Sequence, residues 1–152
     1  MKSKVAKGLA MLMVTLCLAA ASTVVTHGQT PQGLVAQVPF EFVIGDQTMR
    51  AGEYQVRALN DSGDPIVIRD KTGARAVRLT HSAERSDKQL RAKLVFHRYG
   101  STYFLSQIWM AGEQSGRELP KTQQERAIER EAKMLASNGR AYEVVEVVAL
   151  AR

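Results

Sequence analysis

Cysteine is almost absent from this sequence: Cys17 is the only one, and it lies in an apolar run near the N-terminus. The chain outside this run has no thiol, so disulfides, cysteine-based zinc sites and a cysteine nucleophile are excluded there. Glycine-rich phosphate loops are also absent, because neither GxGxxG nor a P-loop motif occurs. No apolar run reaches the roughly 20 residues that a membrane-spanning helix needs. We therefore expect no cofactor and no transmembrane span in the mature chain.

The N-terminus has the three parts of a secretory signal peptide. Three of the first seven residues are lysines, residues 9–21 are apolar, and Ala19–Ala21 give a small–x–small cleavage pattern. We expect residues 1–21 to be a signal peptide that is cleaved near Ala21. The protein is then exported, to the periplasm or out of the cell.

Three alternatives to this cleavage remain. A later cut is possible at Thr26–Gly28, and the segment could also stay uncleaved as an anchor. Lipidation at Cys17 is disfavoured, because Leu16 stands where a lipobox has a small residue.

Charge places a further limit on function. The formal net charge of +6 includes the three lysines of the signal peptide, so their removal lowers it by three, to +3. A charge of this size, spread along the chain, is typical of a soluble surface and not of a nucleic-acid-binding protein. We expect no nucleic-acid partner.

Short segments of alternating polarity predict β-strands along most of the chain. Residues 22–36 are small and polar and predict a flexible leader before a single domain, 37–152. The predicted strands cover 38–44, 54–58, 66–69, 75–79, 94–99, 102–109 and 142–150. Turns are predicted at Gly45-Asp46, at 60–64 and at Asp70–Gly73, and loops at 81–89 and 111–117.

The two strands at 94–99 and 102–109 form the central β-hairpin of the prediction. Gly100-Ser101 suits a two-residue type II′ turn, because glycine accepts the positive φ at the first position. This turn pairs Arg98 with Tyr103 and His97 with Phe104. Alternation then puts Leu94, Phe96, Arg98, Tyr103, Leu105, Gln107 and Trp109 on one face, which is the better core candidate. The other face, with Val95, His97, Tyr99, Phe104 and Ile108, is mixed and is either half covered or lines a groove.

One helix is predicted, at about 123–137. Thr122 and Glu125 form a capping box, and an apolar stripe follows at Ile128, Ala132 and Leu135. Asn138-Gly139 predicts its end. Without strand–helix alternation, the pattern favours a mainly β fold: a small antiparallel β-barrel or β-sandwich of about seven strands, with the helix packed across one face or end and followed by a final strand.

Catalytic and metal-binding residues are not indicated. His97 could be a metal ligand or a general base, but only His81 accompanies it in the folded part, and no HxH or HxxxH pair exists. His81, Ser82, Glu84 and Asp87 have the residue types of a hydrolytic triad but lie together in one polar segment without a GxSxG elbow. Strand-borne carboxylates, Glu41, Glu53 and Glu143, have outward positions. We expect no catalytic site and no metal site, with a hydrolase as the least favoured alternative.

Aromatic residues of the hairpin are the only indication of a binding site. Tyr99, Tyr103 and Trp109 with Arg98, and with His97 beside them, could form a platform for a sugar or peptide. The competing interpretation is that Arg98 and Tyr103 are a cation–π pair that packs one end of a barrel.

Three segments carry a resemblance to a known group of proteins. They are VPFEFVIGDQTMRAGEYQV (38–56), KLVFHRYGSTYFLSQIW (93–109) and GRELPKTQQER (116–126). Together they resemble a group of small exported proteins common in acidobacteria. The resemblance implies an exported, small β-rich domain and brings no catalytic residues with it.

These observations favour an exported, non-enzymatic β-domain that acts as a binding or envelope-associated module. The alternative is a barrel that binds a small ligand (a sugar, lipid or peptide). The partner would then be an envelope protein or that ligand, and the sequence does not distinguish between them.

Overall fold

The computed structural model describes residues 33–60, 64–85, 89–135 and 141–152. The chain divides into two units, Met1–Thr30 and Pro31–Arg152, and all described residues belong to the second. The predicted signal peptide and residues 22–32 of the predicted leader lie outside the described residues. Residues 33–36 of that leader belong instead to the first strand, because Leu34 and Ala36 point into the core.

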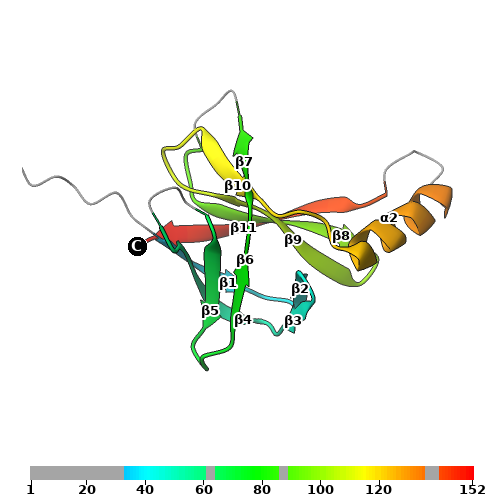
Figure 1. Cartoon of the computed structure of the whole chain (residues 1–152), viewed down its shortest axis with the longest axis horizontal. Coiled ribbons are helices and arrows are strands. Elements are labelled where there is room, and N and C mark those ends of the chain that lie inside the picture. Colours follow the sequence, from blue (N-terminus) through cyan, green and yellow to red (C-terminus); the bar gives the residue numbers. More distant parts are fainter. Residues whose placement is uncertain (1–32, 61–63, 86–88, 136–140) are drawn as a thin grey trace, which may run out of the picture. The chain divides into compact units, whose positions relative to one another are not determined.

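The described residues form eleven strands and one helix (Figure 1). The bounds are β1 Gly33–Val38, β2 Phe42–Ile44, β3 Gln47–Met49, β4 Gly52–Ala58, β5 Ile66–Asp70, β6 Arg75–Arg78, β7 His81–Glu84, β8 Lys93–Tyr99, β9 Thr102–Trp109, β10 Ser115–Glu118, α2 Gln123–Leu135 and β11 Glu143–Ala151. The predicted mainly β class, with a late helix followed by a final strand, is confirmed. The number of strands is larger than the predicted seven.

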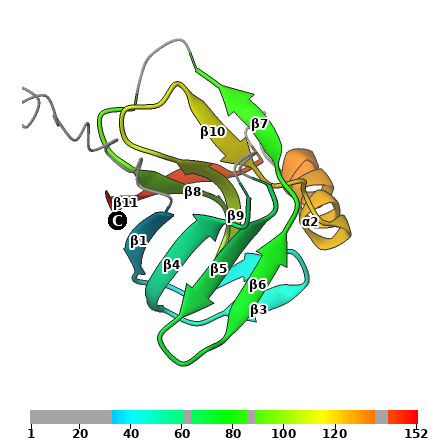
Figure 2. The ribbon, with the colours of Figure 1, turned by 60° about the vertical axis from the view of Figure 1, so that its left-hand side comes forward.

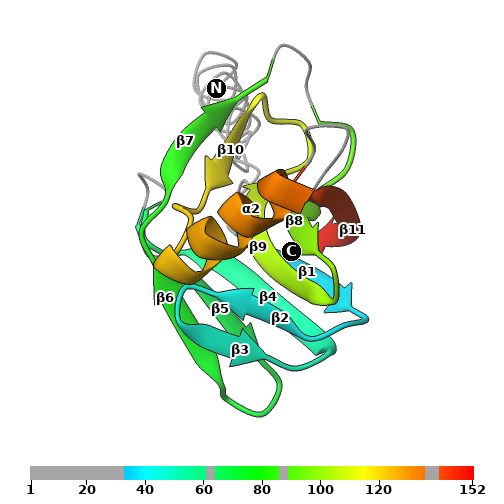
Figure 3. The same ribbon diagram turned by 90° about the vertical axis from the view of Figure 1, so that its right-hand side faces the viewer.

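The strands form one curved sheet in the order β3-β2-β9-β8-β11-β1-β4-β5-β6, with β7 and β10 attached through β9 (Figures 2 and 3). Neighbours are antiparallel, except that β2 pairs with β9 in parallel. The two ends of this order approach each other, because the Nη2 of Arg78 in β6 donates to the carbonyl of Ile44 in β2 over 3.1 Å. The result is a nearly closed, barrel-like sheet.

Alternate side chains of the strands fill the interior, as a pleated sheet requires. The largest of them are aromatic and branched aliphatic residues: Leu34, Val38, Phe42, Ile44, Tyr54, Val56, Ile68, Leu94, Phe96 and Leu105. The core draws on nine strands from both halves of the chain, so the curvature of the sheet brings together side chains that are far apart in sequence.

The central hairpin turns as predicted. Gly100 has a φ of 60°, and no non-glycine residue of the described part has a positive φ, so the turn is of type II′. Arg98 pairs with Tyr103 and His97 pairs with Phe104, again as predicted.

The predicted face of Trp109 is wrong. A bulge shifts the register between Val95 and Phe96, so that Val95 pairs with Gln107 and Ser106 is left over. Beyond the bulge, Ile108 joins Leu94 in the core, and Trp109 takes the opposite face. On the other side of β9, the Ser106 carbonyl accepts a hydrogen bond from the Leu119 amide over 2.8 Å, next to the pairing of β9 with β10.

Two segments that were predicted as loops contain strands. β7 and β10 pair with each other, and β10 also pairs with β9. In contrast, the predicted strand at 38–44 is interrupted, because β1 ends at Val38 and β2 starts only at Phe42. Pro39 has no amide hydrogen to donate to a ladder, which explains the break.

Helix α2 starts where the capping box predicts, since the Glu125 amide donates to the Thr122 hydroxyl oxygen over 3.0 Å. Ile128 and Ala132 pack against a second apolar cluster on the outer face of the hairpin, formed by Val43, Tyr99 and Phe104. The helix thus covers the part of the mixed face that holds His97, Tyr99 and Phe104. Leu135 is 79% exposed, so its predicted place in the stripe is wrong. The predicted stop at Asn138-Gly139 lies outside the described residues.

Candidate functional site

The predicted aromatic platform is only partly assembled. Arg98 lies over the ring of Tyr103, with its Cζ 5.6 Å from the ring centroid. Phe40 stacks on the same ring at a centroid distance of 3.9 Å, and Arg98 also pairs with Glu143 at 3.1 Å. The protein's own side chains thus contact this ring, which is the packing arrangement that the competing interpretation describes. A ligand role for Arg98 and Tyr103 stays a prediction.

The other three residues of the predicted platform lie elsewhere. Trp109 is buried, with Arg85 above its ring at 5.4 Å and Gly116 against it. His97 and Tyr99 lie under α2 on the outer face of the hairpin. The structure therefore places the five predicted residues in three separate surroundings.

A buried polar cluster joins α2 to the hairpin. Glu125, only 4% exposed, directs Oε1 toward His97 Nδ1 at 3.1 Å and accepts a hydrogen bond from the Tyr99 hydroxyl at 3.4 Å. The ring of Tyr142 lies on that of His97, with 4.0 Å between centroids. Every polar side-chain atom buried within the described residues has a hydrogen-bond partner.

Charged side chains lie around this buried cluster. Lys121 lies 5.1 Å from the centroid of the Tyr142 ring and donates to Glu129 over 2.8 Å, and Lys133 reaches Glu129 at 3.1 Å. The hydrogen bond from Lys121 is the main cause that lowers the pKa of Glu129. Burial, followed by the negative charge of Glu125, raises the pKa of Tyr99 above its ordinary value.

A histidine beside a carboxylate is a possible general base, but such a base must reach its substrate. His97 is 9% exposed, and its ring is covered by Tyr142. It also lies outside the lining of the cleft described next. The contacts of His97, Tyr99 and Glu125 are those of a junction between helix and sheet.

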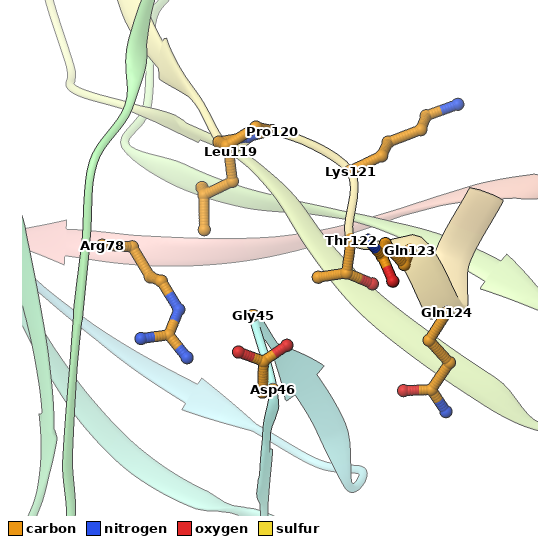
Figure 4. Close-up of a pocket in the computed structure, with 9 residues that line it drawn as sticks. All are labelled: Gly45, Asp46, Arg78, Leu119, Pro120, Lys121, Thr122, Gln123 and Gln124. Atoms are coloured by element: carbon orange, nitrogen blue, oxygen red, sulfur yellow. The ribbon is translucent and has the colours of Figure 1, made fainter.

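A cleft of about 510 Å³ opens where the barrel nearly closes, and we call it the seam cleft (Figure 4). Three segments line it: the β2–β3 turn, the end of β6 and the entry to α2. The lining residues are Gly45, Asp46, Arg78, Leu119, Pro120, Lys121, Thr122, Gln123 and Gln124. The side chain of Lys121 points away from the cleft, which agrees with its bond to Glu129.

Two backbone carbonyls hold the side chain of Arg78 in the seam cleft. Its Nη1 donates to the Val77 carbonyl over 2.8 Å and its Nη2 to the Ile44 carbonyl over 3.1 Å. Gly45 makes room for it, because a Cβ at this position would fall 1.9 Å from Arg78 Nε. Its φ of 60° also favours glycine. The guanidinium is thus positioned by the protein itself, without a carboxylate partner among the described residues.

Comparisons with known proteins do not narrow the function. No protein-family model matches the chain, no curated protein matches it, and no solved structure matches its fold. Within the described ranges, no three His, Cys, Asp or Glu side chains group closely enough to hold a metal ion. None of the helices in the described part is long and apolar enough to cross a membrane.

Sequence reasoning missed the seam cleft. Gly45-Asp46 was interpreted only as a turn, and Thr122 only as a helix cap. One signal was present, because Arg78 alternates with Arg75 and Val77 and so shares the inward side of its strand with Ala76. An arginine on the buried side of a strand needs polar partners, and this predicts a polar site at the end of β6.

Proposed function

We propose that this chain is an exported, non-enzymatic binding domain whose seam cleft holds a small ligand that carries a carboxylate. Its signal-peptide pattern and its resemblance to small exported proteins support export. The single observation that carries the binding proposal is the guanidinium of Arg78, fixed by two backbone carbonyls at the wall of the cleft.

The size and the donors of the cleft support this ligand class. Its volume of about 510 Å³ lies in the range of small-molecule sites. A guanidinium has five N–H donors, of which the two carbonyls occupy two, so three remain. A carboxylate can accept two parallel hydrogen bonds from such a fork, and a site that is already rigid loses little entropy on binding.

Asp46 narrows the ligand class further. Its carboxylate lines the same cleft as Arg78 and forms no ion pair within the described residues. It would repel a simple dianion and would accept hydrogen bonds from hydroxyl or ammonium groups. The expected ligand therefore combines one carboxylate with donor groups, as acidic sugars and the ends of peptides do.

Thermal unfolding of residues 22–152 with paired ligands tests the proposal. The panel contains uronic acids and short peptides, each beside its uncharged amide. A ligand at 100 times its dissociation constant stabilises a protein by about 2.7 kcal/mol, which is several degrees in a domain of this size. We expect the carboxylates to raise the melting temperature and the amides to raise it much less.

Two variants locate the effect. Arg78→Gln should abolish the shift, whereas Arg75→Gln, on the same strand but facing outward, should retain it. The proposal is wrong if carboxylate and amide shift the wild type equally, or if Arg78→Gln responds like the wild type.

A further inference from the structure

A second surface of the barrel concentrates positive charge. Strands β4, β5 and β6 lie next to one another in the sheet (Figure 2). Their outward sides present the exposed Arg57, Arg69 and Arg75. Val67 and Val77 lie between them, paired across the strands with each other, and Val67 is also paired with Arg57. We call these five residues the arginine face.

Two charges on this face oppose each other directly. Arg69 and Arg75 are cross-strand partners, and like charges in this position destabilise a sheet. None of the three arginines has an ion pair within the described residues, and the neighbouring Lys71 is neutralised by Glu53 at 3.2 Å. The face thus has a charge of +3 without ion-pair partners among the described residues. The repulsion between Arg69 and Arg75 lowers the stability of the sheet locally.

Exposed apolar side chains accompany the arginines. Leu59 and Leu79 follow Arg57 and Val77 by two residues and are 59% and 68% exposed. The Leu59 amide is fixed by a hydrogen bond to the Pro65 carbonyl over 2.9 Å, so the backbone at this leucine is held in place. Basic side chains combined with exposed leucines also occur on amphipathic helices that lie in the interface of an anionic membrane, where the apolar side chains enter the lipid and the charges meet the headgroups.

We infer that the arginine face docks on an anionic phospholipid surface. Lipid phosphates are mobile and can move to each guanidinium, so the three arginines need no matching arrangement of fixed acidic groups. The exposed leucines can enter the boundary between headgroups and acyl chains, which a soluble acidic protein segment does not offer. The inference is independent of the seam cleft, because the cleft uses the opposite side of β6.

Vesicle flotation of residues 22–152 tests this inference. This chain contains the whole compact unit Pro31–Arg152 and omits the apolar run at 9–21, which would itself bind lipid. We expect binding to phosphatidylcholine vesicles that contain phosphatidylglycerol and little binding to phosphatidylcholine alone. Raising the salt from about 0.1 M to about 1 M shortens the Debye length from about 10 Å to about 3 Å and should release the protein.

The decisive comparison uses two triple variants of equal charge. The first variant replaces Arg57, Arg69 and Arg75 by Gln. The second variant replaces three exposed arginines outside the arginine face by Gln: Arg91, Arg126 and Arg130. A basic residue near an anionic surface contributes about 1 kcal/mol, or roughly fivefold, so the first variant should partition on the order of 100-fold more weakly. The second variant should lose much less of its vesicle binding. Because the first variant removes a repulsive pair, its urea midpoint should not fall.

Two results would overturn the inference. One is an equal loss of vesicle binding in both triple variants, since net charge alone would then explain it. The other is binding to soluble polyglutamate without binding to the anionic vesicles, which would assign the face to an acidic protein partner.

Discussion

Glu125→Ala is the substitution that tests the junction between α2 and the barrel most directly. The change removes a carboxylate that is 4% exposed and leaves the ring of His97 and the hydroxyl of Tyr99 without their common acceptor. Alanine keeps the helix intact, because it is the best helix former, and the Thr122 cap uses the Glu125 backbone amide and not its side chain. Any loss of stability therefore reports the buried contacts.

The magnitude follows from those contacts. A hydrogen bond to a charged group contributes about 1.5–3 kcal/mol, and breaking a buried pair by removing one partner costs about 3–5 kcal/mol. The Tyr99 bond is long, at 3.4 Å, so we place it at the low end. We expect Glu125→Ala to lower the free energy of unfolding by about 3 kcal/mol. Glu125→Gln, which keeps an acceptor oxygen, should cost clearly less.

Urea unfolding followed by fluorescence measures this effect, because Trp109 is the only tryptophan and is buried. Glu131→Ala is the matched control: it is an exposed glutamate of the same helix and should change the stability by less than about 0.5 kcal/mol. The reasoning is refuted if Glu125→Ala and Glu131→Ala destabilise equally. A double-mutant cycle with His97→Ala should also show coupling, since the two side chains are in contact.

Two further predictions concern packing and pH. Gly116→Ala should destabilise the fold by about 1–3 kcal/mol and shift the Trp109 emission, because the new Cβ would lie 2.6 Å from Trp109 Cε3; an unchanged urea midpoint would contradict this. The pKa of Tyr99 is raised by burial and by Glu125, so the unfolded chain loses this proton first as pH rises past the ordinary value of 10.0. The stabilisation from Tyr99 is then complete below about pH 10 and is lost above it. Urea midpoints measured across this range should fall less in Tyr99→Phe than in the wild type, and equal slopes would contradict the assignment.

Local patterns predicted the parts of the fold that depend on neighbouring residues. The turn at Gly100-Ser101 requires only a positive φ at one glycine, and the start of α2 requires only Thr122 and Glu125 at the right spacing. Both are confirmed. The capping box does not predict the role of the Glu125 side chain, however. The carboxylate turns toward His97, which is 28 residues away along the chain.

The strands that sequence reasoning missed depend on distant partners. β7 and β10 carry few apolar residues, and their backbones find hydrogen bonds in each other and in β9. The pattern of polar and apolar residues therefore does not predict these two strands, because their side chains contribute little to the pairing. The bulge at Ser106 is hidden for the same reason, because the Ser106 carbonyl bonds to the amide of Leu119, which is remote in sequence. This one-residue shift is what moved Trp109 to the other face.

Both proposed surfaces depend on the register of one short strand. β6 presents Arg75 and Val77 outward and Ala76 and Arg78 inward, so a slip of one residue would exchange the two sets. The turn before β6 prevents this slip. Asp70 accepts hydrogen bonds from the amide and the hydroxyl of Thr72, its own amide donates to the Ala74 carbonyl over 3.0 Å, and Gly73 takes a φ of 96°. The tight turn at Asp70–Gly73, which the sequence predicts, thereby positions both Arg78 in the seam cleft and Arg75 on the arginine face.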